Sequence, residues 1–325
     1  MVRPAAGDLL VIDFRYHLIS IIAVLLALGI GIFAGSGFLG GPLLDDLERR
    51  LGSLQEKNNT YKDTNEDLRS ELALAGDFVR AVEPMLVGGS LSDERVVVFE
   101  LEGTDSAVVE DLLGTVEQAG GVSVSRVLLR DKLALEQQTD LDQLALIVDS
   151  TDDRPREVRR EAAQDIGIAV AAAGSFAGGE PRGVASAAQD VDALFEELDR
   201  AGFLSVDQLE GDDPVPPGTS FVIAGGSGEP APYEVAAFVA ELARVIAHRG
   251  SGVIVAEPRA SVWGLATGVR EDEAATDEVA TSDQADTIEG RIATVLGLAA
   301  AGRGEVGDYG IGPGATSLLP TPPSG

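Results

Sequence analysis

An uncharged apolar segment near the N-terminus constrains this chain more than any other feature. Residues 18–39 read LISIIAVLLALGIGIFAGSGFL and contain no charged residue, Asn, Gln or Pro. An α-helix needs roughly 20 apolar residues to cross the hydrocarbon core of a bilayer. The segment therefore predicts one transmembrane helix over 18–39, preceded by a short segment (1–17) and followed by the working part of the protein.

A cleavable signal peptide is the competing interpretation of this segment. Ala34-Gly35-Ser36 offers small residues for cleavage, but signal peptides have apolar cores of about 7–15 residues and a basic run before them. Here only Arg3 and Arg15 precede the core, offset by Asp8 and Asp13. We therefore favour a membrane anchor. Lys and Arg on both sides leave its orientation open; we favour a cytoplasmic segment 1–17 and an extracytoplasmic soluble domain.

The composition excludes one class of partner and several kinds of site. The 325 residues include 54 Asp and Glu against 24 Lys and Arg, a net charge of −30. A surface this acidic repels phosphate backbones, so we expect no nucleic-acid binding. The chain has no cysteine, which excludes disulfides, thiolate metal sites and a cysteine nucleophile.

Apolar residues recur with a seven-residue period over 43–82, beyond a helix break predicted at Gly40-Gly41-Pro42. This period predicts a coiled coil. Asn58 and Asn65 at a positions cost stability but favour a parallel, in-register homodimer. A helix folded back on its own domain and a higher oligomer are the alternatives. The a and d positions are Leu44, Leu47, Leu51, Leu54, Asn58, Tyr61, Asn65, Leu68, Leu72, Ala75, Val79 and Val82.

The transmembrane segment offers separate support for pairing. Gly31 and Gly35 lie four residues apart on an apolar helix, and this spacing permits close contact between helices. We therefore predict that they pack two membrane helices together.

Residues 90–309 show a different pattern, in which short β-branched runs alternate with helical stretches. This alternation predicts βαβ units and a Rossmann-like, mostly parallel sheet, and so an α/β fold. The tail from 310 to 325, rich in Gly and Pro, is expected to be disordered. The predicted strands are 95–101, 122–129, 144–149, 220–224 and 252–256; the predicted helices are 105–118 (capped by Asp105 or Thr104), 156–163, 185–201, 232–249 and 288–301; 166–172 fits either.

In such sheets, ligands lie beyond the carboxyl ends of the strands. The turn containing Gly225, Gly226 and Gly228 follows a strand and can offer backbone N–H groups to an anion. It matches neither the dinucleotide-binding motif nor the P-loop, so a flexible turn is the alternative. Asp149 and Glu257 follow two other predicted strands and complete the candidate ligand site.

Metal binding and catalysis find less support. Asp149, Glu257, Asp283 and Asp286 can bind a hard cation only if the fold brings them together. The only histidines are His17, at the membrane edge, and His248, near the end of a helix, where it meets the helix dipole. No G-x-S-x-G motif occurs, so we predict no enzyme and no evident cofactor. Trp263 is expected to anchor the core or an interface.

Two ends of the chain resemble the actinobacterial MctB-type copper transport protein family. The N-terminal likeness is in RYHLISI (15–21) and GIGIFAGS (29–36), followed by the coiled coil. The C-terminal likeness is in TSDQADT (281–287), GRIATVL (290–296), Tyr309-Gly310 and Leu318-Leu319-Pro320. The resemblance implies a cell-envelope protein acting in copper homeostasis or efflux, and copper as a ligand by this likeness alone.

The residues themselves supply few copper ligands. Cu(I) prefers thiolate and thioether sulfur, and Cu(II) prefers imidazole. The chain has two methionines, Met1 and Met85, besides its two histidines. Two hypotheses follow: an envelope protein of copper homeostasis without an evident copper site of its own, or a dimeric, non-catalytic scaffold that presents the α/β domain to an envelope or septum-maturation partner.

Overall fold

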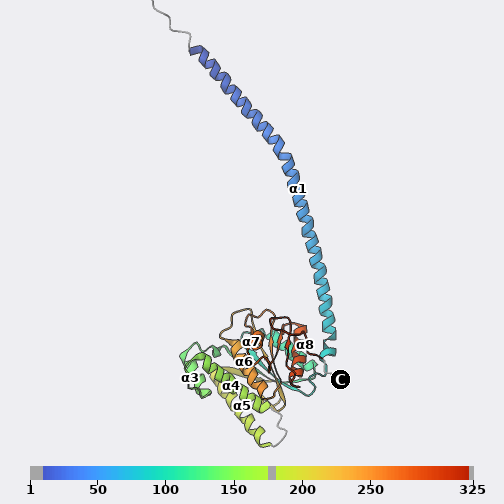
Figure 1. The fold of residues 1–325 in the computed structure, drawn as a ribbon, viewed down its shortest axis with the longest axis vertical. Coiled ribbons are helices and arrows are strands. Elements are labelled where there is room, and N and C mark those ends of the chain that lie inside the picture. Colours follow the sequence, from blue (N-terminus) through green and yellow to red (C-terminus); the bar gives the residue numbers. More distant parts are fainter. Residues whose placement is uncertain (1–9, 175–180, 322–325) are drawn as a thin grey trace, which may run out of the picture. The chain divides into compact units, whose positions relative to one another are not determined.

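A computed structural model describes residues 10–174 and 181–321, and the side chains of these except 10–13, 36–45 and 181–189. The chain divides into two units, one ending at Leu74 and one beginning at Ala75. Figure 1 shows a long N-terminal helix and a layered α/β unit. The predicted fold class is confirmed: an apolar N-terminal helix, a long helix and a mostly parallel sheet.

The N-terminal unit consists of helix α1 (Leu10–Val87), which continues into the second unit. Its stretch Phe14–Gly35 is long and apolar enough to cross a membrane, and all its side chains are exposed. The break predicted at 40–42 is wrong, because α1 is continuous there. A proline removes one N–H donor and glycine only lowers helix stability, so the neighbouring hydrogen bonds carry the helix through.

The heptad positions of α1 present an uncovered apolar row. Leu51, Leu54 and Tyr61 are 63%, 61% and 73% exposed, and Asn58 and Asn65 are exposed in the same row. The end of α1 differs, because Val79 and Val87 pack against the core of the second unit. The buried Glu83 also accepts a hydrogen bond from Thr115 at 3.2 Å. The last heptad therefore contacts the chain's own domain.

A seven-stranded sheet forms the centre of the second unit, in the order β3-β2-β1-β4-β5-β6-β7. All neighbours are parallel except β3, which runs antiparallel to β2. The strand order reverses between β1 and β4, as in doubly wound folds. The strands are β1 (Arg95–Leu101), β2 (Val122–Leu129), β3 (Leu204–Gln208), β4 (Thr219–Ala224), β5 (Val253–Glu257), β6 (Ala280–Asp283) and β7 (Asp308–Tyr309).

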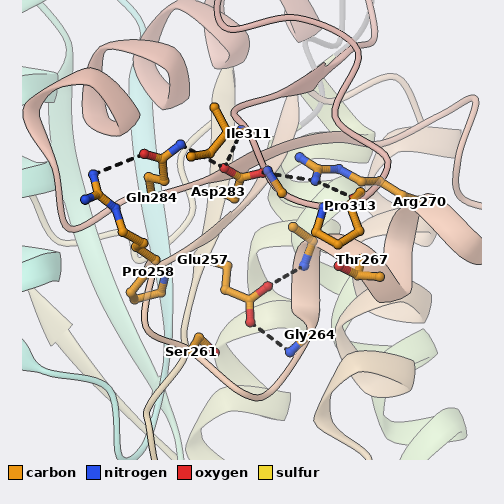
Figure 2. A pocket seen from close by; sticks show the side chains of 13 residues that line it. Glu257, Pro258, Ser261, Gly264, Thr267, Arg270, Asp283, Gln284, Ile311 and Pro313 are labelled. Atoms are coloured by element: carbon orange, nitrogen blue, oxygen red, sulfur yellow. Dashed lines mark hydrogen bonds and ion pairs between the residues drawn. The ribbon is translucent and has the colours of Figure 1, made fainter.

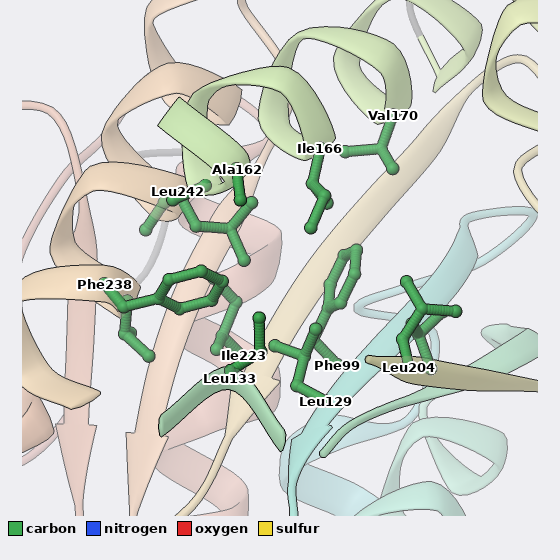
Figure 3. Packing of buried hydrophobic residues seen from close by; sticks show 14 of the residues in the cluster. Phe99, Leu129, Leu133, Ala162, Ile166, Val170, Leu204, Ile223, Phe238 and Leu242 are labelled. Atoms are coloured by element: carbon green, nitrogen blue, oxygen red, sulfur yellow. The ribbon is translucent and has the colours of Figure 1, made fainter. Parts of the chain in front are cut away.

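Helices cover both faces of the sheet, and each face has its own apolar core. One face packs against α2 (Ser106–Gln118), α8 (Ile288–Ala301) and the end of α1. The other packs against α3 (Gln138–Ile147), α4 (Pro155–Gly174), α5 (Pro181–Ala201), α6 (Val235–His248) and α7 (Leu265–Glu271), with the short 3₁₀ helix η1 (Asp131–Ala134) beside them. In Figure 3, Ile166 of α4 points toward Phe99 and Ile223 of the sheet.

Most predicted elements are confirmed, including the cap of α2, where Asp105 accepts a hydrogen bond from the backbone N–H of Ala107. The strand predicted over 144–149 is wrong, because these residues end helix α3. Leu141 and Leu144 are buried three residues apart while Leu146 is 82% exposed, which is helical periodicity. The ambiguous run 166–172 belongs to α4. Strands β3, β6 and β7 and helix α7 were not predicted.

The tail also differs from its prediction. Disorder was expected from residue 310 onward, but residues 310–317 are hydrogen-bonded to the sheet. The backbone N–H of Gly310 donates to Ser317, and those of Thr316 and Ser317 donate to Asp308 of β7. These bonds satisfy backbone N–H groups of the segment. Residues 310–317 therefore form an ordered turn beside β7, the terminal strand of the sheet. Residues 322–325 lie outside the described part.

Candidate functional site

A cavity of about 310 Å³ lies at the carboxyl ends of β5 and β6 (Figure 2). In an open α/β sheet this is the edge where ligands bind. The walls come from the loop after β5, from α7 and from the C-terminal segment. They include Glu257, Pro258, Arg259, Ser261, Thr267, Arg270, Asp283, Gln284, Ile311 and Pro313. Of the candidate ligand site, only Glu257 lines this cavity, and Asp283 of the candidate cation set lines it as well.

Glu257 ends β5 and is 6% exposed. Its two carboxylate oxygens accept the backbone N–H groups of Gly264, at 2.8 Å, and Ala266, at 3.0 Å. Both donors lie at the start of α7, where backbone N–H groups lack helical partners. The carboxylate therefore fixes the first turn of α7, and its hydrogen bonds are used within the protein.

Arg270 of α7 lies at the centre of a second set of contacts, with only 3% of its side chain exposed. Its guanidinium donates to Thr281 at 2.7 Å and to Asp283 at 3.1 Å, both on β6. It also donates to the backbone carbonyls of Tyr309, at 2.9 Å, and Pro313, at 3.0 Å. One buried cation thus joins α7, β6 and the C-terminal segment.

Asp283 completes this arrangement from the end of β6. Its oxygens accept the backbone N–H groups of Ile311 and Gly312, each at 2.9 Å. Burial alone would raise the pKa of Asp283, but these N–H groups together with Gln284 and Arg270 hold that pKa below its usual value. Gly310 has φ +123°, and a side chain there would collide with the Asp283 carboxylate. Asp283, within the segment TSDQADT (281–287), therefore holds the C-terminal segment against the end of β6.

The glycine-rich turn is engaged in packing. The N–H of Gly225 donates to Ala256 at 3.1 Å, and that of Gly226 donates to the hydroxyl of Thr104 at 3.2 Å. Gly226 has φ +141° and lies so close to Ser261 that a Cβ would force a shift. Gly228 has more room around it. Two of the N–H groups predicted to face an anion are thus already bonded within the protein.

Trp263 lies beside the point where the strand order reverses, and its 8% exposure confirms a core role. The indole lies beside Gly103, in the turn that follows β1; a Cβ at Gly103 would touch the ring at 3.5 Å. The indole N–H donates to the carbonyl of Glu229, after β4, at 2.9 Å. Nucleotides bind at this position in doubly wound folds. In this protein the indole of Trp263 packs at that position.

The remaining candidates do not converge. Asp149 lies after α3, not after a strand, and its charge contributes, after burial and Glu161, to raising the pKa of Asp165. Asp286 accepts the backbone N–H of Arg259 at 2.6 Å. His248 ends α6, as predicted, 3.3 Å from Glu278. Within the described residues, no three or more His, Cys, Asp or Glu side chains are placed to hold a metal ion.

Sequence reasoning missed Arg270 as a functional residue of this edge. The motif 281–287 was noticed for its family likeness, and it supplies two of the side chains that Arg270 contacts. A prediction of β6 would have placed Thr281 and Asp283 at the carboxyl end of the sheet. The single arginine of the preceding helix, Arg270, would then have been the expected counterion of Asp283. Asn58, Asn65, Gly31 and Gly35 lie exposed on α1, and their predicted roles in pairing stay predictions.

Comparison with known proteins shows likeness over nearly the full chain. Residues 11–320 match the family described as "Copper transport outer membrane protein, MctB". The "Copper transporter MctB" of Mycobacterium tuberculosis (strain CDC 1551 / Oshkosh) is 27% identical over 321 residues, covering 94% of this chain and 98% of the relative. The protein of that name from Mycobacterium leprae (strain TN) is 26% identical over 319 residues, with the same coverage.

The match includes the apolar helix, the heptad segment, the sheet and the residues around Arg270, so it confirms the resemblance seen at both ends of the chain. It favours the copper-family hypothesis over the scaffold alternative. The chain belongs to the family of the copper transport outer membrane protein MctB.

Proposed function

We propose that the protein acts in copper homeostasis at the cell envelope as a single-pass, membrane-anchored, non-enzymatic member of the MctB family. The family match over residues 11–320 carries this proposal. The single apolar span found among the described residues supports membrane attachment. We place the α/β unit on the extracytoplasmic side, where an envelope protein of this family would meet its partners.

The side chains available argue that copper is handled with a partner and not held by this chain alone. Soft thiolate and thioether ligands select Cu(I), and imidazoles suit Cu(II). The chain has no Cys, and Met85, His17 and His248 are its candidate donors beyond the initial Met. Met85 is 82% exposed at the end of α1, and His248 is exposed beside Glu278. Within the part of the chain that the structure describes, no group of three or more His, Cys, Asp or Glu side chains could hold a metal ion.

A complementation experiment tests the copper role. We expect a strain lacking this protein to grow less well in copper and to hold more cell-associated copper, measured by mass spectrometry of washed cells. The full chain should restore both values. The variant His17→Ala/Met85→Leu/His248→Ala should restore them too, because in this proposal copper tolerance does not depend on these three side chains. A chain beginning after residue 39 should not restore them, since it lacks the anchor.

Two outcomes contradict the proposal in different ways. Unchanged copper tolerance and copper content in the deletion strain would remove the copper role altogether. Restoration by the full chain but not by the triple variant would show that the protein's own side chains bind copper. An equally abundant, membrane-located triple variant, checked by immunoblot, is required for that comparison.

We also propose that α1 pairs with a second copy in a parallel coiled coil. The uncovered row of Leu51, Leu54, Tyr61 and Leu68 supports this, because each of these apolar side chains is more than half exposed in the single chain. Burying such a row would contribute about 25 cal/mol for each Å² of apolar surface removed from water. Asn58 and Asn65 would then face their own copies across the seam and set the register.

Cysteine cross-linking tests this dimer cleanly, because the natural chain has no cysteine. Asn58→Cys places a thiol on the seam, where the separation between equivalent Cα atoms suits a disulfide in a parallel dimer. We expect mild oxidation of the full chain in detergent to yield mainly covalent dimer. The matched control Glu56→Cys, two residues away on the opposite face, should form no covalent dimer, although its helices would pair as in the natural chain. Equal cross-linking of both variants, or of neither, would count against the coiled coil.

A further inference from the structure

Strand β3 leaves one edge of the sheet open. It is the terminal strand in the sheet order and pairs with β2 alone. The carbonyl of Phe203 accepts the N–H of Arg130 at 2.9 Å, and the N–H of Leu209 donates to Val124 at 2.8 Å. Antiparallel pairing alternates along a strand. The backbone groups of Leu204, Val206 and Gln208 therefore point away from β2; Leu204 is buried, so the open part of this edge is at Val206 and Gln208.

A groove runs beside this edge, between β3, α5 and the loop that follows β3. Its volume is about 550 Å³. The groove has an apolar floor made by Phe195 of α5, Val206 of β3 and Pro214 of the loop. Val206 and Gln208 belong both to the groove and to the set of outward-facing backbone positions. A polypeptide strand laid along β3 would thus meet main-chain hydrogen-bonding groups and side-chain space together.

The rim of the groove is acidic. Asp192, Glu196 and Asp199 follow one another at helical spacing along one face of α5, and Asp212, in the loop after β3, also lines the groove. No Lys or Arg is among the residues that line it, although Arg200 approaches Glu196 to 3.5 Å from outside. Burial, together with Asp213 and Glu196, raises the pKa of Asp192. A cation in the groove would relieve this crowding of like charge.

We propose that the groove between α5 and β3 is a docking site for an extended, lysine- or arginine-bearing segment of a partner polypeptide, which adds to the sheet as a strand beside β3. In this recognition mode main-chain hydrogen bonds give affinity, and side-chain pockets give specificity. Alternate side chains of the added strand point to one face of the sheet, toward the acidic rim. The cationic residues of the partner belong at those alternate positions.

Binding of a defined peptide to the full chain in detergent tests this site without copper or cells. The probe is a fluorescein-labelled peptide of alternating lysine and valine, and its glutamate–valine counterpart is the charge control. We expect the lysine peptide alone to bind. The variant Asp192→Asn/Glu196→Gln/Asp199→Asn should weaken that binding by about tenfold or more, because it removes the opposing charges. The matched variant Glu271→Gln/Glu273→Gln/Asp277→Asn changes the net charge equally and should bind as the natural chain does.

Hydrogen exchange and a proline substitution test the proposed main-chain hydrogen bonds to β3 separately from the charges. Binding should slow hydrogen exchange at the amides of Val206 and Gln208, which would become bonded to the peptide. Val206→Pro removes one outward donor at a strand edge, where proline is tolerated, and should weaken binding several-fold; Val206→Thr keeps the donor and should not. The proposal is overturned if these amides gain no protection in the natural chain. Equal weakening by the two charge variants would also overturn it.

Discussion

Arg270→Met is expected to destabilise the α/β unit by about 3–5 kcal/mol, the usual result of removing one partner from a buried ion pair. The methionine fills much of the same space, but Asp283 and Asp308 would keep their charges without the guanidinium that now lies 3.1 and 3.4 Å away. The carbonyls of Tyr309 and Pro313 would lose their donor as well. Hydrogen exchange at the amides of β5 and β6 measures the loss as a free energy of opening.

An exposed arginine provides the control for this substitution. Arg303→Met breaks a pair with Glu305 in which both side chains are about half exposed, so its cost should stay within about 1 kcal/mol. Adding Asp283→Asn and Asp308→Asn to Arg270→Met should recover part of the loss, because the unpaired charges are removed. If Arg270→Met lowers the free energy of opening by no more than Arg303→Met does, the Arg270 guanidinium does not stabilise the contacts between α7, β6 and the C-terminal segment.

Trp263→Ala should cost about 3–5 kcal/mol, the range for deleting a large buried aromatic side chain. The indole is 8% exposed, belongs to the larger apolar core and donates a hydrogen bond to Glu229. Alanine would leave a void beside Gly103 and the carbonyl of Glu229 without its donor. Hydrogen exchange at the amides of β1 and β4, which end beside the indole, is the appropriate measurement because the variant has no tryptophan fluorescence.

The neighbouring residue separates the effect of the indole from any disturbance of its loop. Val262 is 64% exposed, so Val262→Ala should change the stability by no more than about 0.5 kcal/mol. Trp263→Phe should lie between the two, since phenylalanine fills part of the space without the N–H donor. A Trp263→Ala variant as stable as Val262→Ala would show that the ring contributes little to the core.

The sequence predicted the long, strongly patterned elements and missed the short ones. Helices such as α2 and α8 have both an apolar period and a capping residue, Asp105 and Thr287, and each was found within a residue or so of its bounds. Strand β6 reads ATSD and β7 only DY, so neither has an apolar run to recognise. Strand β3 lies at an edge, where two of its five positions are exposed and polar.

The candidate site was predictable only in part, because it depends on which strands are neighbours. Glu257 was placed correctly at the end of a buried strand. Asp149 was misplaced because LALIV fits a strand and a helix equally well until its burial is known. Arg270 gave no local signal: its partners lie 11 to 43 residues further along the chain. Such long-range pairing cannot be read from spacing without the order of the strands.

The network around Arg270 also orders the events of folding. Thr281 and Asp283 are synthesised 11 and 13 residues after Arg270, but Tyr309 and Pro313 follow only 39 and 43 residues after it. A nascent chain that ends before them keeps the guanidinium partly hydrated and the outer side of β6 unpaired. Unpaired strand edges in incomplete chains invite aggregation. The α/β unit can therefore complete the contacts of Arg270 only after synthesis has passed residue 313.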